Sequence, residues 1–253
     1  MRLPTPAEIA VAAGVRLFRT DLHVPTYRDA QYGRWKIVRS GFLLDNGYCG
    51  DTYGVAGTPV LLRRNGKSWE TWMAITPFEV ESQEIVCRHA WGHTVVMGLG
   101  MGWAALNIAL RPEVTKVTVV ERDPEIIELF QVSGARDGLA DEVLEKLEIV
   151  EADALTWRSA VPVDVLFADI WRKFADRRTL DQVRAMQANL AAEQIYFWGQ
   201  EEVILEQAYK RGITKIDDAL VARCLVAWIE LPLLVPQDRD YPAMLHAVSR
   251  RRS

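Results

Sequence analysis

The sequence predicts an α/β fold, a doubly wound and mostly parallel sheet that follows a small β-rich lobe at the N-terminus. Beyond the first third of the chain, short apolar strands alternate regularly with helical segments, which is typical of a parallel sheet with helices on both faces. The first of these strands runs straight into alternating glycines. The residues before it hold scattered aromatics and a hairpin signal. We therefore divide the chain into a β-rich lobe at 1–75 and an α/β domain at 76–253.

The hairpin signal is the segment TPVLLRRNGKSWETWM, in which Asn65 and Gly66 separate two strand-like runs. These residue types tolerate the positive φ angles of a type I′ turn, which joins two antiparallel strands through a two-residue loop. We therefore expect a tight hairpin with Asn65 and Gly66 as its turn residues.

A helix is expected directly after the lobe. Thr76 suits the N-cap, Pro77 suits the first helical position, and Glu79 completes a capping box with Thr76. Gly92 is suited to end the helix.

Five predicted strands build the sheet, and four of them end at the GLGMG loop or at an acid. Their segments are HTVVMG, KVTVVE, LEIVEAD, VDVLFAD and QIYFWG. A helix follows the glycines and stops before Pro112, and another begins with Asp123 as its cap and Pro124 at its first position. Ligands bind at the carboxyl ends of the strands in such sheets, so these strand ends predict a ligand site.

The last part of the chain departs from this alternation. A helix is expected over 200–210, and the segment IDDALVARCLVAWIELPLLVP predicts a second helix. That helix runs into an extended segment that contains Pro232 and Pro236. Proline lacks the backbone N–H that regular secondary structure needs, so these two residues interrupt the segment. We therefore expect a modified C-terminal end.

The glycine loop GLGMG is the strongest functional signal. Glu121 lies 23 positions after Gly98, at the end of the next strand, where a carboxylate can accept hydrogen bonds from two ribose hydroxyls. The dinucleotide fingerprint G-x-G-x-x-G would need a third glycine at Trp103, and a tryptophan there would crowd a pyrophosphate. The pattern therefore predicts a nucleoside-bearing ligand that is not a dinucleotide.

With these residues the chain resembles the class I S-adenosylmethionine-dependent methyltransferases, and within them the branch that is similar to spermidine synthases, over 76–199. The resemblance implies a Rossmann-like class I methyltransferase fold with S-adenosylmethionine as cofactor. Such folds usually finish with an antiparallel strand pair, which we do not find here. The implied cofactor-binding residues are Gly98, Leu99, Gly100, Met101, Gly102, Glu121, Arg122, Asp153, Ala154 and Asp169.

The resemblance implies different roles for the later acids. Asp153 would accept a hydrogen bond from the adenine amine, while the backbone amide of Ala154 serves a ring nitrogen. The alternative is that Asp153 caps a helix over ALTWR. Asp169 would line the transfer site, either as the base that takes the proton of the nucleophile or as a partner of the cofactor's ammonium group.

Three more side chains are candidates for lining the substrate site by the same resemblance: Glu79, Gln83 and Trp171. For Glu79 the alternative is the capping box alone, and for Trp171 it is packing.

Two departures from the resembling families restrict the acceptor. From Asp169, the acid at the end of VDVLFAD, the sequence reads DIWRKFADRR, which places Arg172 and Lys173 where spermidine synthases need negative charge for a cationic amine. We therefore expect no spermidine formation. The tetrapeptide N-P-P-Y or D-P-P-Y, which grips planar amino groups, is missing as well. Arg172, Lys173, Arg177 and Arg178 either attract an anionic acceptor or form a solvated helix face.

We expect a methyltransferase that acts on a small, unidentified acceptor. An aminopropyltransferase is the alternative enzyme, and a non-catalytic nucleoside-binding partner protein is the alternative outside catalysis. The net charge of −4 argues against nucleic acid as a partner, and without 18 consecutive apolar residues no membrane span is expected. A small-molecule partner is expected, and the choice between a monomer and a homo-oligomer stays open.

Cysteine and histidine positions bear on compartment and metals. Three cysteines far apart support neither a disulfide framework nor a zinc spacing, which indicates a reducing compartment, the cytoplasm. No metal site is expected, because the histidines lack ligand spacing: His23, His89, His93 and His246.

Overall fold

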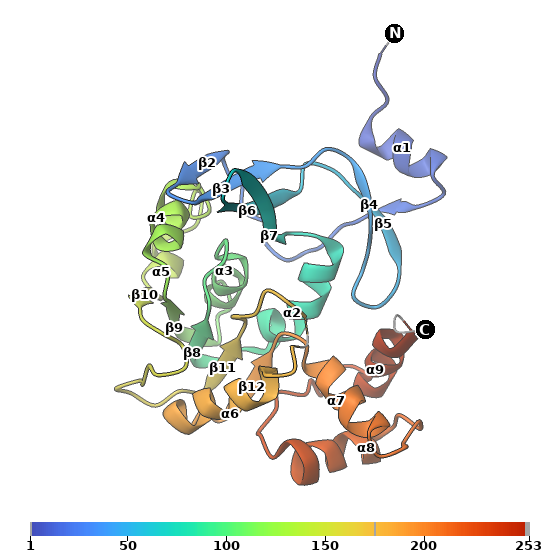
Figure 1. Ribbon diagram of the computed structural model, residues 1–253, viewed down its shortest axis with the longest axis vertical. Coiled ribbons are helices and arrows are strands. Elements are labelled where there is room, and N and C mark those ends of the chain that lie inside the picture. The colour runs from blue at the N-terminus through green and yellow to red at the C-terminus, as the bar shows by residue number, and fades with distance from the viewer. Residues whose placement is uncertain (1, 175, 251–253) are drawn as a thin grey trace.

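The computed structural model describes residues 2–174 and 176–250, and its centre is a five-stranded parallel sheet (Figure 1). The strands lie in the order β10-β9-β8-β11-β12 and are all paired in parallel. Their bounds are β8 (Gly92–Met97), β9 (Val114–Glu121), β10 (Leu147–Glu151), β11 (Val165–Ala168) and β12 (Gln194–Phe197). The strand order reverses between β8 and β11, which creates the switch point of a doubly wound sheet. The predicted Rossmann-like fold is confirmed.

Helices cover both faces of this sheet. The crossovers from β8 to β9 and from β11 to β12 run in opposite directions, so the right-handed rule places their helices on opposite faces. No helix in the described part of the chain is long and apolar enough to cross a membrane. The helices are α2 (Pro77–His89), α3 (Trp103–Ala109), α4 (Pro124–Val132), α5 (Asp141–Leu144), α6 (Thr179–Leu190) and α7 (Gln200–Tyr209).

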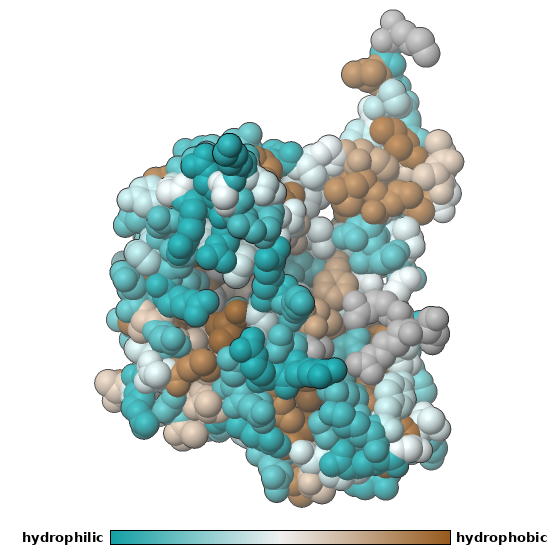
Figure 2. All heavy atoms as spheres, in the orientation of Figure 1, coloured by the Kyte–Doolittle hydropathy of each residue, from teal (hydrophilic) through white to brown (hydrophobic). Residues whose placement is uncertain are grey.

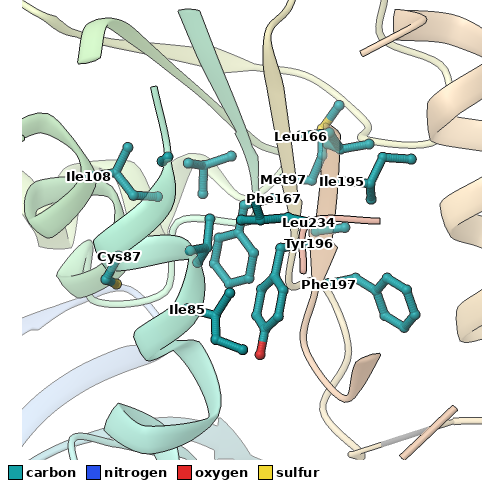
Figure 3. Packing of buried hydrophobic residues seen from close by; sticks show 14 of the residues in the cluster. Ile85, Cys87, Met97, Ile108, Leu166, Phe167, Ile195, Tyr196, Phe197 and Leu234 are labelled. Atoms are coloured by element: carbon teal, nitrogen blue, oxygen red, sulfur yellow. The ribbon is translucent and has the colours of Figure 1, made fainter. Parts of the chain in front are cut away.

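The core lies between the central strands and their helices. All four residues of β11 are buried, as expected for a strand covered on both faces. The rings of Phe167 of β11 and Tyr196 of β12 are stacked, with an interplanar angle of 28° and centroids 6.1 Å apart. Ile85 and Cys87 of α2 lie on the same side of the sheet as these rings (Figure 3). The helix before the sheet therefore contributes to the main core.

The N-terminal lobe is built from two small sheets. One has the order β1-β5-β4 and the other the order β2-β3-β6-β7. The elements are α1 (Pro6–Ala12), β1 (Arg16–Leu17), β2 (Ala30–Tyr32), β3 (Trp35–Arg39), β4 (Leu43–Asn46), β5 (Thr52–Val55), β6 (Pro59–Asn65) and β7 (Ser68–Ala74). The segment is β-rich, as expected, and its attachment to the domain involves specific polar contacts.

The lobe is attached to the segment that follows β8. The hydroxyl of Tyr27 donates to the Met101 carbonyl at 3.1 Å, and both groups are buried. Asn107 of α3 both accepts from the His23 amide and donates to the His23 carbonyl, at 2.8 and 2.9 Å. These contacts hold the lobe against the glycine loop.

α1 was not predicted, and it projects from the body of the protein (Figure 1). A capping box joins Thr5 and Glu8 at its start. Apolar side chains are exposed on this arm, Leu3 by 87% and Val11 by 79%. Figure 2 shows brown, hydrophobic surface in the region of α1. Ala10 is the one residue of α1 that is buried, so this helix adds little to the core.

Two details of the predicted lobe and helix are wrong. Asn65 pairs with Ser68 in the hairpin, so the turn residues are Gly66 and Lys67, and only Gly66 has a positive φ, of +59°. A type I′ turn needs positive φ at both central residues. The capping box of α2 does not form either, because Glu79 binds Gln83 one turn later and Thr76 makes no side-chain cap.

The C-terminal end is mainly helical. α8 (Asp218–Arg223) continues as a π-helix, η1 (Cys224–Ile229), and α9 (Tyr241–Arg250) follows, which was not predicted. No antiparallel strand pair follows β12 in the described residues. Instead Leu233 forms a single parallel bridge with Ile195 on the outer edge of β12. The extended segment between the two prolines therefore covers a sheet edge that would otherwise be open to pairing.

A buried carboxyl connects the lobe, the sheet and the C-terminal helices. Glu201 accepts from Tyr48 of the lobe and from Tyr241 of α9, each at 2.9 Å, and the Tyr196 hydroxyl lies 3.2 Å away. Burial raises the pKa of Glu201, and the three hydroxyls lower it. Each donor comes from a different segment, so one carboxyl joins three parts of the chain.

Glu201→Ala is expected to lower the free energy of unfolding by about 3 kcal/mol or more, because the buried Tyr48 and Tyr241 hydroxyls lose their common acceptor. Glu206→Ala on the same helix is the control. Its carboxylate pairs with Lys210 at the surface, and such pairs contribute roughly 0–1 kcal/mol. Chemical denaturation of both variants measures the difference, and equal losses would contradict the prediction.

Candidate functional site

A cavity of about 620 Å³ lies at the carboxyl ends of the five parallel strands. This is the edge at which open α/β sheets bind ligands. All the predicted site residues except Met101 and Gly102 line it: Gly98, Leu99, Gly100, Glu121, Arg122, Asp153, Ala154, Asp169, Glu79, Gln83 and Trp171. Residues from five strand ends and from α2 therefore come together in one place.

Met101 and Gly102 support the glycine loop from behind. Met101 is buried, and its carbonyl accepts the hydrogen bond from Tyr27. Gly102 caps α3 with a φ of +80°, and a Cβ at this position would lie 2.2 Å from the Phe130 ring. Both residues hold the loop in place, and neither lines the cavity.

The other two glycines allow contacts that a side chain would block. Gly98 has a φ of +100°, and a Cβ there would lie 2.2 Å from the Asp169 carbonyl oxygen. Gly100 has a φ of +54°, and its Cβ would lie 2.6 Å from the Met73 sulfur. The loop thus lies directly between the end of β11 and the lobe.

Glu121 connects the glycine loop to the end of β9. One carboxylate oxygen accepts from the Leu99 amide at 3.0 Å and the other from the Asp123 amide at 2.8 Å. Each carboxylate oxygen has a second lone-pair site, so acceptor capacity toward the cavity remains. Glu121 therefore has a structural task in addition to its predicted ribose contact.

Asp153 follows β10 and begins a turn. One of its carboxylate oxygens accepts from the Leu155 amide at 2.8 Å, and its carbonyl accepts from Thr156 and Trp157 at 3.1 and 2.9 Å. The alternative of a helix over ALTWR is wrong, since the segment forms only this turn. Asp153 and the buried Ala154 line the cavity, and the adenine contact stays a prediction.

Two acids share one amide at the cavity floor. The Gln83 side-chain nitrogen donates to Glu79 at 2.6 Å and to Asp169 at 3.1 Å. Burial raises the pKa of Asp169 to about 7. Burial and the nearby Asp169 carboxyl hold the pKa of Glu79 well above its ordinary value. The floor of the cavity therefore holds two acids that are hard to ionise together.

Aromatic side chains form the walls of the cavity, and several were not predicted. Trp72 and Met73 reach it from β7, and Trp198 reaches it from the end of β12. Trp198 donates to Ser82 of α2 at 2.9 Å. Trp198 stands immediately before Gly199 at a predicted strand end, and this position could have predicted that it lines the cavity. The two lobe residues had no such signal, because their place depends on how the lobe docks.

The cationic segment after β11 is partly neutralised. Arg172 pairs with Glu70 of the lobe at 2.9 Å, and Arg178 pairs with Asp176 at 3.4 Å. Trp171 donates to Gln182 of α6 at 2.6 Å, which fixes its indole at the cavity wall. Lys173 also lines the cavity, so positive charge remains beside the acids. Arg177 is exposed and does not line the cavity.

Trp103 tests whether the cavity fits the implied ligand. It is 1% exposed and lines the cavity at the position of the third dinucleotide glycine. Its indole nitrogen has no hydrogen-bond partner among the described residues. A bulky side chain here is consistent with a nucleoside ligand that lacks a pyrophosphate, and the carboxylates of Glu121 and Asp153 suit ribose and adenine donors. The residues present therefore fit S-adenosylmethionine.

No protein-family model and no curated protein match the chain. Among solved structures it is similar to the 23S rRNA methyltransferase ErmE, at 18% identity and a TM-score of 0.34, covering 46% of this chain and 43% of that one. It is also similar to the glycopeptide N-methyltransferase MtfA complexed with S-adenosyl-L-homocysteine, at 14% identity and a TM-score of 0.35, covering 44% and 43%. A third structure is CalS10, an amino pentose methyltransferase from Micromonospora echinaspora, at 19% identity and a TM-score of 0.31, covering 44% and 47%. The chain covers less than half the length of each.

Gly98→Ala is expected to lower the free energy of unfolding by about 2–4 kcal/mol, because the new Cβ combines backbone strain with a clash against the Asp169 carbonyl. Gly138→Ala is the matched control. Gly138 has a φ of +78° and nothing within 4 Å of a Cβ, so its substitution costs only the strain, about 1–2 kcal/mol. Urea unfolding compares the two, and a smaller loss at Gly98 than at Gly138 would refute the close-contact argument.

Proposed function

We propose that the protein is an S-adenosylmethionine-dependent methyltransferase that acts on a small acceptor. The observation that carries this proposal is the cavity itself, which brings together the glycine loop, Glu121, Asp153 and Asp169 at one edge of the sheet. Its volume of about 620 Å³ is in the range of small-molecule sites, roughly 300–1,000 Å³. The resemblance to class I methyltransferases supports the choice of cofactor.

The sheet order suggests how the ligand would lie. Glu121 and Asp153 end β9 and β10, on one side of the central strand β8. Asp169 and Trp198 follow β11 and β12, on the other side. We place the nucleoside at the β9 and β10 ends, the glycine loop around its amino-acid part, and the acceptor beside Asp169.

The chemistry at the acceptor end follows from the side chains there. When bound, S-adenosylmethionine supplies a methyl group on a positively charged sulfur, which leaves as a neutral thioether when the acceptor's lone pair bonds to the methyl carbon. Asp169 receives the proton that the acceptor loses. With a pKa of about 7, this carboxyl is well matched to proton transfer near neutral pH. Trp198 and Trp171 align the acceptor and exclude water.

Two alternatives stay distinct from this proposal. Aminopropyl transfer would follow from membership in the spermidine-synthase-like branch, and it requires decarboxylated S-adenosylmethionine. A nucleoside-binding partner protein without catalysis would bind the ligand and turn nothing over. A reducing, cytoplasmic setting is in keeping with the separated cysteines, and it is part of the same proposal.

Calorimetry is expected to detect binding of S-adenosylmethionine and of its demethylated product. Glu121→Ala should weaken this binding by about 1.5–3 kcal/mol through the loss of a charged hydrogen-bond acceptor. Glu151→Ala is the control, since Glu151 is exposed and pairs with Glu121 in register without lining the cavity. Absence of binding to either ligand and to the decarboxylated form would refute the proposal.

Incubation with decarboxylated S-adenosylmethionine and putrescine is expected to yield no spermidine by chromatography. Putrescine carries two positive charges, and Lys173 adds a like charge to the cavity wall. Lys173→Ala serves as the comparison, because it removes this charge without changing the acids at the floor. Clear spermidine formation by the unaltered protein would contradict the prediction and favour the aminopropyltransferase.

A further inference from the structure

The acids at the cavity floor are close enough to act as one unit. Gln83 lies one helical turn after Glu79 on α2, and its side-chain amide nitrogen has two N–H groups. One N–H serves Glu79 at 2.6 Å and the other serves Asp169 at 3.1 Å. Glu79 is 7% exposed, so water contributes little to its solvation. The pair therefore depends on a single neutral amide for its hydrogen bonds.

One amide is too little to support two buried negative charges. Removing a carboxylate from water costs several kcal/mol unless hydrogen bonds or an opposite charge compensate. Like charges that share a site resist double ionisation, so one of the two acids holds its proton. Asp169 adjoins the open part of the cavity and is less buried than Glu79. The charge is therefore better placed on Asp169.

We infer that Glu79 and Asp169 carry one negative charge between them, with Glu79 kept as a neutral acid and Asp169 ionised. Glu79 is a positioning residue in this arrangement, since its neutral form leaves the negative charge on Asp169, which takes the acceptor's proton. The role in transfer rests on the proposed function. The sharing of one proton is a property of the protein alone.

Other charged groups line the cavity, and none of those in the described residues is in an ion pair with Glu79 or Asp169. On α2 the remaining partner is the neutral Gln83, and the end of β12 adds only the neutral Trp198. The end of β9 contributes Glu121 and Arg122. The connection from β11 to α6 contributes Arg172, Lys173, Asp176 and Arg178, of which Arg172 and Arg178 are already in ion pairs.

Carbon-13 NMR titration of the carboxyl groups in the intact protein tests the inference without any acceptor. Asp169 is expected to titrate near its pKa of about 7, while Glu79 stays protonated through that range. Glu79→Gln keeps a neutral side chain of the same size. The Asp169 midpoint should therefore stay within about half a pH unit of its original value.

In contrast to Glu79→Gln, which should leave the Asp169 midpoint unchanged, Asp169→Asn should change the midpoint of the remaining acid, Glu79. Removing the ionised partner removes the repulsion, so the Glu79 midpoint should fall, although burial still holds it above its ordinary value. Glu81→Gln is the control on the same helix, because Glu81 binds the Cys49 amide and does not line the cavity. It should leave the Asp169 midpoint unchanged.

The titration has clear contrary outcomes. A fall of the Asp169 midpoint by about one pH unit or more in Glu79→Gln would show that Glu79 was ionised first, which overturns the inference. Independent ionisation of both acids at their ordinary values would overturn it as well. Neither result depends on whether S-adenosylmethionine binds.

A second measurement connects the pair to the ligand. The cationic sulfonium of S-adenosylmethionine should gain affinity over its neutral demethylated product by roughly 3–10-fold as the pH rises through 7 and Asp169 ionises. This gain should persist in Glu79→Gln and disappear in Asp169→Asn. If the gain in affinity were lost only in Glu79→Gln, Glu79 and not Asp169 would carry the negative charge, which would overturn the inference. Failure of both ligands to bind would refute the proposed function, while the NMR titration would still decide the protonation state.

Discussion

The site depends on the close approach between Gly98 and the Asp169 backbone. A Cβ on Gly98 would lie 2.2 Å from the Asp169 carbonyl oxygen, so only glycine allows the loop after β8 to lie against the end of β11. Glu121 then holds the other side of the loop through the Leu99 amide. The loop is thus fixed between the two strands that flank β8, and this arrangement gives the cavity its floor and one wall.

Local signals were sufficient to predict the α/β domain. The strands are short apolar runs bounded by glycines, prolines and acids, and such signals lie within a few residues of one another. Asp123 accepts from the Glu125 amide at the start of α4 as predicted, because an N-cap depends only on residues next to it. Since parallel strands have their carboxyl ends at one edge of the sheet, the residues that follow the strands necessarily lie near one another at that edge.

Features that depend on long-range packing could not be predicted. Trp72 and Met73 line the cavity because the lobe docks on the α/β domain, through Tyr27 and His23 among other contacts. The hairpin turn shifted by one residue because strand pairing, and not turn preference, decided the role of Asn65. Helix α9 was not predicted, and its contact with Glu201 through Tyr241 joins residues 40 positions apart in the sequence.

The buried carboxyls of this protein differ in how many hydrogen-bond donors surround them. This difference distinguishes the carboxyl that stabilises the fold from the two that line the ligand cavity. Glu201 has three tyrosine hydroxyls around it and does not line the ligand cavity, so its hydrogen-bonding capacity is used within the fold. Glu79 and Asp169 share a single amide and face open space. An arrangement that leaves carboxyl oxygens without partners costs stability. It is retained most readily where a ligand completes the missing hydrogen bonds, and for this reason we propose that the acceptor reacts at the Glu79–Asp169 end of the cavity.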